Sequence, residues 1–140
     1  VGARYYDLVV QVGDNLIRYE KKAWKLDNID KLLPKSIKSK FAADDDFAED
    51  TGQLFKDLVQ LKADVGLCCT RWSFDARAAD YPGGADAIRD KIVMLAEKNK
   101  QALKAGMGLD LELEADDEIF KDFIKQLKNT DFVEISAKVE

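Results

Sequence analysis

The sequence contains no histidine, and it has only two cysteines and two prolines among 140 residues. The lack of histidine excludes Ser-His-Asp and Cys-His catalytic sites, His-ligated zinc or haem, and the helical Glu-x-x-His di-iron motif. No stretch approaches the roughly 18 consecutive apolar residues of a membrane-spanning helix. We therefore expect a protein that is not an enzyme, carries no metal or other cofactor, and does not span a membrane.

The remaining composition is ordinary for a globular domain. Hydrophobic residues make up 46% of the chain and charged residues 35%, and the length suits one domain with a substantial core. The net charge of −5 at pH 7 disfavours binding to nucleic acid. The sequence begins at Val1 with neither a methionine nor a signal-peptide pattern, so we expect a processed form whose targeting segment is missing.

Apolar residues recur at helical spacing in four stretches, each long enough for several turns. The four predicted helices cover approximately residues 5–33, 46–79, 84–105 and 116–129. Pro34 is expected to end the first helix, and Asp46 and Glu49 match the spacing of a capping box at the start of the second. The predicted fold is therefore all-α: an antiparallel, up-and-down four-helix bundle that forms a single domain over residues 1–140.

Two connectors separate the later helices. The sequence DYPGG at residues 80–84 is a strong break, because proline and glycine interrupt regular structure. Residues 106–117, GMGLDLELEADD, are longer, and Leu109, Leu111 and Leu113 alternate as they would in a short strand. We expect this second connector to be an extended link packed on the bundle.

The two cysteines, Cys68 and Cys69, are adjacent and lie within the second predicted helix. Redox and metal sites commonly use Cys-x-x-Cys, which this chain lacks. Neighbouring cysteines on a helix point in different directions, so a disulfide between them would distort the backbone. We predict two free thiols in or beside the core; a vicinal disulfide and a functional thiol are the alternatives. Trp72, one turn after Cys68, is predicted to be buried.

We assign no catalytic, metal-binding or cofactor-binding site to the acidic and polar residues. Carboxylates cluster at residues 43–50 and 114–118, but neither cluster has the D-x-D-x-D-G spacing of a calcium loop. Both fall at predicted helix starts, where acidic side chains interact favourably with the helix dipole. Asn99 falls on the inward face of the third predicted helix, where a polar residue more often fixes packing register than binds a ligand.

Positive charge is concentrated in residues 18–40, which contain eight Lys or Arg and three Asp or Glu, a balance of +5, whereas residues 41–140 carry −9. Such a strip can steer association with an acidic partner, or it can simply be a solvated face. The candidate docking residues are Arg18, Lys21, Lys22, Lys25, Lys31, Lys35, Lys38 and Lys40. Trp24 lies among these cations and is expected to pack with lysine stems over its ring.

Two segments have a distinctive layout: KKAW at residues 21–24 in a Lys-rich first helix, and LFKDLVQLKADVGLCCTRWSFDARA at residues 54–78 as a long second helix with Arg71 and Trp72 near its end. With these segments, the chain resembles the PsbQ-type extrinsic subunits of photosystem II, in particular their algal relatives. The resemblance covers roughly residues 5–132 at the level of layout. The proline-rich N-terminal extension of plant members is absent, and the adjacent cysteines depart from the family.

The resemblance implies a non-catalytic subunit that docks peripherally on the lumenal face of photosystem II, in the chloroplast thylakoid lumen. Such a subunit stabilises the oxygen-evolving complex by helping to retain calcium and chloride, without binding them itself. Its partners would be the photosystem II core and the other extrinsic subunits, and not nucleic acid.

The alternative hypothesis is a four-helix-bundle carrier or enzyme for a small ligand or a metal. Such a protein places several ionisable residues inside the bundle. The inward faces predicted here offer Tyr19, Thr51, Cys68 and Asn99, and no carboxylate cluster. The docking subunit is therefore the preferred hypothesis.

Overall fold

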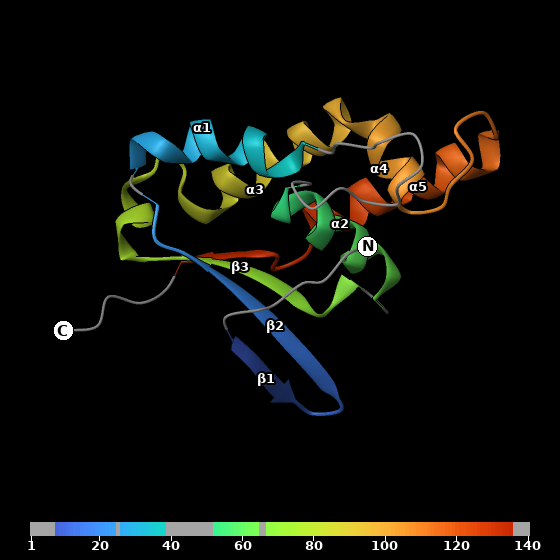
Figure 1. Ribbon diagram of the computed structural model, residues 1–140. Helices are drawn as coiled ribbons and strands as arrows, with labels where there is room; N and C mark the ends of the chain where they lie inside the picture. The colour runs from blue at the N-terminus through green and yellow to red at the C-terminus, as the bar shows by residue number, and fades with distance from the viewer. Residues whose placement is uncertain (1–7, 25, 39–51, 65–66, 136–140) are drawn as a thin grey trace.

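The computed structural model describes residues 8–24, 26–38, 52–64 and 67–135, which form a four-stranded sheet and a set of helices (Figure 1). The strands are β1 (Leu8–Val12), β2 (Asn15–Lys22), β3 (Thr70–Phe74) and β4 (Val133–Ile135). The helices are α1 (Leu26–Ile37), α2 (Gln53–Ala63), α3 (Gly84–Lys98), α4 (Lys100–Gly106) and α5 (Glu114–Lys128), with a short 3-10 helix, η2, at Ala76–Asp80. The predicted all-α, antiparallel four-helix bundle is therefore wrong, because the fold is mixed α/β.

A β-hairpin occupies most of the predicted first helix. Residues 8–17 are rich in Val, Leu and Ile, and the two-residue turn is Gly13–Asp14, since Val12 pairs with Asn15. Gly13 has a φ of 62°, which glycine adopts at little cost. Apolar side chains occur on both faces of these strands, so their spacing also satisfied a helical pattern.

α1 begins only at Leu26, and Pro34 lies inside it instead of ending it. Proline removes one backbone donor and disfavours the helical region for the preceding residue. The helix nevertheless continues to Ile37, because Ile29, Leu33 and Ile37 form one buried face. Packing of this face outweighs the local preference against the helix.

The predicted second helix, residues 46–79, is also divided. α2 ends at Ala63, and the chain then turns into β3. Leu67 stands in this turn with a φ of 54°, a left-handed conformation that no residue inside a right-handed helix adopts. The proposed capping box, Asp46 and Glu49, lies outside the described residues.

The strand order is β1-β2-β3-β4, with β1 antiparallel to β2 and the other two pairs parallel. Each parallel connection crosses over through helices: α1 and α2 follow β2, and α3 to α5 follow β3. The connections β2 to β3 and β3 to β4 both step in the same direction across the sheet. Because such connections are normally right-handed, both place their helices on the same face of the sheet. Figure 1 shows the helices on one side of the sheet, with the β1–β2 hairpin extending beyond them.

Trp72 lies at the centre of the core, as predicted, although in a strand and not in a helix. Its side chain is fully buried, and its indole N–H donates to the buried Asp57 carboxylate of α2 at 2.7 Å. Its ring packs edge-on against Trp24 at 5.9 Å and stacks with Phe132 at 6.3 Å between ring centroids. Trp72 therefore joins β3 to α2 and to the segment that precedes β4.

The last two predicted helices are present. α3 and α4 together cover residues 84–105, and α5 closely matches residues 116–129. The break between α3 and α4 is at Asn99, whose side-chain amide donates to the Leu95 carbonyl oxygen at 2.8 Å. A local hydrogen bond to the preceding turn competes with helix continuation and accounts for the break.

The connector at residues 106–117 differs from its prediction. It contains no strand, and its residues 114–117 already belong to α5. Leu111 and Leu113 are 46% and 55% exposed, so this link is not packed on the body along its length. Alternating leucines alone are therefore insufficient to form a strand here, because none of the four described strands pairs with them.

Candidate functional site

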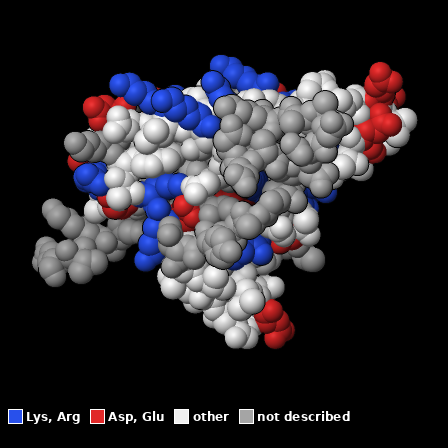
Figure 2. Space-filling model, viewed as in Figure 1, with Lys and Arg blue, Asp and Glu red and all other residues white. Residues whose placement is uncertain are grey.

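The β1–β2 hairpin, residues 8–22, presents apolar side chains to solvent. All five residues of β1 are exposed, and four of them are apolar. Val9 and Val12 are 51% and 53% exposed, and Leu16 of β2 reaches 57%. Figure 2 shows mostly uncharged atoms in this region, at the lower edge of the molecule. Apolar side chains grouped in this way on a surface mark a site of interaction.

β1 is also an edge strand, because β2 is its only neighbour in the described sheet. One side of its backbone therefore presents N–H and C=O groups that no described strand pairs. Natural edge strands are commonly protected by lysine, proline, a bulge or a covering helix. The β1 sequence, LVVQV, contains neither a charge nor a proline, so this edge can accept a further strand.

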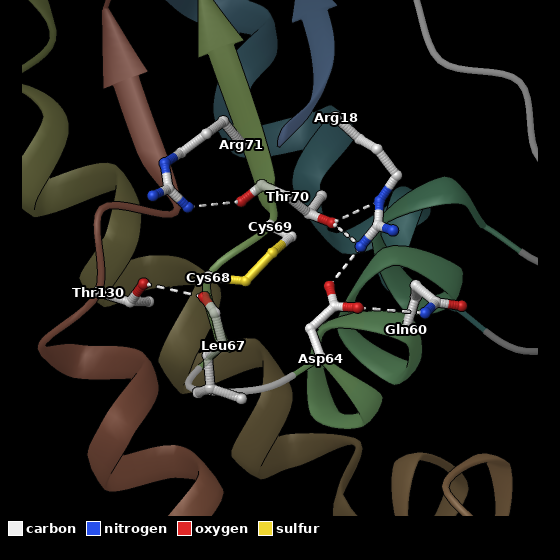
Figure 3. Close-up of a disulfide and its surroundings, with 9 residues drawn as sticks. All are labelled: Arg18, Gln60, Asp64, Leu67, Cys68, Cys69, Thr70, Arg71 and Thr130. Carbon is white, nitrogen blue, oxygen red and sulfur yellow. Dashed lines mark hydrogen bonds and ion pairs between the residues drawn. A yellow bond between two sulfur atoms is a disulfide. The ribbon is translucent and has the colours of Figure 1, made fainter. Parts of the chain in front are cut away.

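Arg18 attaches the hairpin to the rest of the protein (Figure 3). Its backbone N–H donates to the Cys69 carbonyl oxygen at 2.8 Å, and its guanidinium donates to the Thr70 hydroxyl at 3.0 Å. The same guanidinium forms an ion pair with Asp64, which follows α2. Since β2 pairs with β3 from Arg18 onward, this residue fixes the point at which the hairpin leaves the helix-covered sheet.

Cys68 and Cys69 form a disulfide just before β3, so the prediction of two free thiols is wrong (Figure 3). That prediction assumed a helix, in which neighbouring side chains diverge. Here α2 has already ended and Leu67 has a positive φ, so the backbone is irregular. The Thr130 hydroxyl donates to the Leu67 carbonyl oxygen at 3.4 Å, which ties this turn to the segment before β4.

The basic residues of 18–40 that the structure describes have different surroundings. The side chain of Lys22 is only 11% exposed and pairs with Glu20 at 3.0 Å. Its ammonium group lies over the rings of Trp72, at 4.7 Å from the centroid, and Trp24, at 5.3 Å. The contact over Trp24 is therefore made by the ammonium group of Lys22, whereas the prediction was of lysine stems, and Lys22 belongs to the packing between sheet and helices.

The other candidate docking residues of the first half of this strip are also dispersed. Arg18 is engaged at the base of the hairpin, whereas Lys21 is exposed on β2. Lys25 and Lys40 lie outside the described residues. The described residues Arg18, Lys21 and Lys22 therefore differ in how accessible they are to a partner.

Lys31, Lys35 and Lys38 are exposed along and just after α1. Their spacing of four and three places them on one side of the helix, and we call them the α1 lysine face. Figure 2 shows basic atoms along the upper edge of the molecule, over α1. This face and the hairpin lie at opposite ends of the view, so they are separate surfaces.

Asp30 of α1 does not neutralise this lysine face, because its carboxylate is engaged elsewhere. Lys91 of α3 pairs with it at 2.7 Å, and the Tyr81 hydroxyl donates to it at 2.6 Å. The hydrogen bond from Lys91, followed by that from Tyr81, lowers the pKa of Asp30. Burial, together with Asp30, raises the pKa of Tyr81 to about 12. The contact therefore joins α1 to α3 and leaves the α1 lysine face positive.

Carboxylates do not assemble a metal centre in the part of the chain that the structure describes. No three Cys, Asp or Glu side chains there lie close enough together to hold a metal ion. The acidic residues at 114–118 lie in the first two turns of α5, whereas those at 43–50 fall outside the described residues. Over the same described ranges, no helix is both long enough and apolar enough to cross a bilayer.

The prediction of a helix over residues 5–33 missed the β1–β2 hairpin, although the sequence contains a signal for its turn. Gly13–Asp14 separates two short segments rich in Val, Leu and Ile. A Gly-Asp pair between such segments is typical of a two-residue hairpin turn. The turn chemistry, and not the spacing of apolar residues, therefore distinguishes the two structures.

Comparison with known proteins gives no match: no protein-family model, no curated protein and no solved structure is significantly similar to this chain.

Proposed function

We propose that the protein is a non-catalytic interaction module that binds an extended segment of a partner protein by strand addition along β1. The observation that carries this proposal is the composition of the edge strand: five exposed residues, four of them apolar and none charged. Exposed apolar groups are costly in water unless another molecule covers them. Strand addition covers the side chains and pairs the backbone groups in one step.

The alternation of side chains between the two faces of β1 defines which residues the partner segment should carry. Leu8, Val10 and Val12 share one face of the strand, because successive side chains point to opposite faces. A partner strand would extend this face with its own apolar residues at alternate positions. Main-chain hydrogen bonds then supply affinity, and the apolar cross-strand pairs select the sequence.

The test uses short synthetic peptides that carry valine or leucine at alternate positions. Titration into the isotope-labelled protein, followed by backbone NMR, is expected to shift the amide signals of β1 first. The matched control peptides carry N-methyl groups on alternate residues, which remove backbone donors but keep the side chains. Strand addition requires these donors, so the control peptides are expected to bind at least about tenfold more weakly, a difference of about 1.4 kcal/mol.

The Val10→Lys variant supplies the second control. It places a charge in the middle of the edge, as natural edge strands do, and is expected to abolish peptide binding while leaving the unfolding free energy nearly unchanged. Equal binding of methylated and unmethylated peptides, or signal shifts remote from β1, would contradict the proposal. A dimer in sedimentation velocity that the same variant dissolves would identify the occupant as a second copy, and would also contradict it.

The prediction that the partner is photosystem II, bound on its lumenal face, is still a prediction. The bundle layout on which the resemblance to PsbQ-type subunits partly rested is wrong, and KKAW now lies at the end of β2. The remaining support is the α1 lysine face, which can steer the protein toward an acidic surface. This role is independent of the hairpin, because the two surfaces are separate.

Rebinding to salt-washed photosystem II tests this partner. The useful variant reverses Lys31, Lys35 and Lys38 to Glu, because Lys22 is part of the internal packing and its reversal would also destabilise the fold. The reversal is expected to slow association and to remove most of its salt dependence. Failure of the wild-type protein to rebind would reject photosystem II as the partner, whatever the outcome of the peptide experiment.

A further inference from the structure

A second lysine cluster surrounds a surface cavity of about 430 Å³ beside α5. Its walls carry Glu97 from α3, Lys100 from α4 and, from α5, two apolar residues and three lysines. Sites for small molecules typically measure about 300–1,000 Å³ and combine an apolar lining with a few polar groups. The cavity therefore has the size and the composition of a small-ligand site.

The periodicity of α5 creates this arrangement. Phe120 and Ile124 are one turn apart and buried, so they form an apolar floor that is already supported by the core. Lys121, Lys125 and Lys128 follow with steps of four and three, which places their side chains along the rim. The result is an apolar base beneath a row of ammonium groups.

The cavity continues into a neighbouring depression of about 410 Å³, with which it shares Glu97 and Lys128. The added wall consists of Asp90, Val93 and Met94 of α3, and Met94 is 44% exposed. Methionine is flexible and polarisable, which suits it to line irregular apolar sites. The two depressions together form a groove along α3 and α5, and its apolar lining residues are Val93, Met94, Phe120 and Ile124.

The lysines of this groove fall into two classes. Lys100 and Lys121 are held by Asp117, whose distance from Lys121 is 3.4 Å. The hydrogen bond from Lys100, with a further one from Lys121, lowers the pKa of Asp117 to about 2, so this carboxylate stays ionised. Lys125 and Lys128, by contrast, form no ion pair with any described carboxylate, and their charges are available to a ligand.

The last turn of a helix favours lysine through the helix dipole alone. That explanation accounts for Lys125 and Lys128 but not for the apolar floor, nor for Lys100, which reaches the same cavity from a different helix. Four lysines and one glutamate line the cavity, and although Asp117 pairs with Lys100 and Lys121, the charges of Lys125 and Lys128 stay positive on a chain whose net charge is −5. The concentration of positive charge over an apolar base therefore points to a ligand that is both anionic and apolar.

We propose that this groove binds a small amphiphilic carboxylate, such as a medium-chain fatty acid. The hydrocarbon chain would lie on Phe120 and Ile124 and extend toward Met94, and the carboxylate would accept hydrogen bonds from Lys125 and Lys128. Charge-assisted hydrogen bonds of this kind are stronger than neutral ones, and burial of each methylene adds to the affinity. The proposal does not depend on the function of the hairpin.

The test is isothermal titration of the full chain with decanoate, with decan-1-ol as a probe without charge and acetate as a probe without the apolar chain. Decanoate is expected to bind, and the other two are expected to bind at least tenfold more weakly. Backbone NMR is expected to place the decanoate-induced shifts in α5 and in the second half of α3. Shifts confined to the hairpin would show that its exposed side chains, and not the groove, bind the hydrocarbon.

The double variant Lys125→Gln and Lys128→Gln is expected to weaken decanoate binding at least tenfold. Its matched control is Lys31→Gln with Lys35→Gln, which removes the same charge from the α1 lysine face. Both pairs are exposed, so thermal unfolding is expected to be unaffected and excludes a folding defect. The proposal is overturned if decanoate does not bind, or if both double variants weaken it equally.

Discussion

The helical body and the β1–β2 hairpin differ in where they place apolar side chains. In the body, Leu33 and Ile92 are completely buried, whereas in the hairpin Leu16 is 57% exposed. The difference follows from topology, because the helices follow β2 and β3 and cover only the part of the sheet that these connections can reach. Apolar character in the sequence therefore predicts burial only where another element lies within reach.

The comparison also separates stability from interaction. Buried apolar groups of the body contribute to the free energy of unfolding, at roughly 25 cal/mol per Å² of area removed from water. Exposed apolar groups of the hairpin contribute little in the free protein and become useful only when a partner covers them. Substitutions in the two regions are consequently expected to affect different measurements.

The largest expected effect is in the body, at Trp72. Trp72→Ala removes a fully buried ring and the hydrogen bond to Asp57, and is expected to lower the unfolding free energy by about 3–5 kcal/mol. Trp72→Phe keeps most of the ring and is expected to cost less. Urea unfolding monitored by circular dichroism measures both, and an unchanged midpoint in the alanine variant would show that Trp72 does not lie at the centre of the core.

A matched pair of leucines tests the comparison directly. Leu33→Ala in α1 is expected to cost about 2–5 kcal/mol, because Leu33 is completely buried. Leu16→Ala in β2 removes the same atoms from a side chain that is 57% exposed, and is expected to cost less than about 0.5 kcal/mol. Equal losses in urea unfolding would mean that the hairpin is packed against the body in solution.

A matched pair of glycines asks whether the hairpin opens independently. Gly13 and Gly84 have φ values of 62° and 63°, and a Cβ atom at either position would meet nothing within 4 Å. Alanine at either position is therefore expected to cost about 1–2 kcal/mol through backbone strain alone. Gly84→Ala is expected to lower the global stability, whereas Gly13→Ala is expected to speed hydrogen exchange only in β1 and the start of β2. Faster exchange throughout the protein in both variants would show a single cooperative unit.

The disulfide is expected to have a smaller effect. Intact protein without reductant should have a mass lower by two hydrogen atoms than the reduced form, since Cys68 and Cys69 are bonded to each other. Replacing both with serine is expected to change the unfolding free energy by less than about 1 kcal/mol, because a link between adjacent residues restricts the unfolded chain far less than a long loop does. Two thiols that react with a thiol reagent in the unreduced, denatured protein would contradict the assignment.

Acid is expected to have the smallest effect, and only on the body. The pKa of Asp117 is about 2 in the folded protein against an ordinary value of 3.8, so its ionised form is favoured by folding. Its contribution to stability is therefore complete above the ordinary value and is lost as the pH falls through the folded value. Asp117→Asn is expected to lower the midpoint of urea unfolding slightly at about pH 5 and to have a clearly smaller effect at about pH 2, where the folded carboxyl is partly protonated. A difference that persists undiminished in acid would exclude the charge as its cause.

Much of the second half of the fold could be predicted from the sequence. α5 has a continuous apolar face, acidic residues in its first turn and lysines in its last, so the spacing of apolar residues and the helix-dipole signals agree. The break at residues 80–84 was predicted from its proline and glycines and contains the end of η2 and the start of α3. These elements were predictable because their signals are local.

The first half could not be predicted in the same way, because its signals conflict. The apolar residues of 8–22 satisfy a helical spacing, and only the turn at Gly13–Asp14 and the β-branched content indicate strands. β3 is only five residues long, too short for its own pattern of apolar residues to distinguish a strand from a helix. It forms a strand because it pairs with β2 and β4, which are distant in the sequence. The candidate sites reflect the same limit: the lysines of α1 were identified from charge, but the exposed edge of β1 requires the sheet to be known.

The parallel arrangement of β2, β3 and β4 has a consequence for synthesis of the protein. β1 and β2 can pair as soon as β2 has left the ribosome, because hairpins form from local contacts. β3 lies between two distant strands, and Trp72 opposes Val133 in β4, so the central strand gains its second neighbour only after residues 133–135 have been translated. During elongation, at about 5–20 residues per second, the nascent chain therefore displays an apolar edge strand and an incompletely covered tryptophan for several seconds. A chaperone that holds exposed strands would act on this protein during that interval, before the sheet is complete.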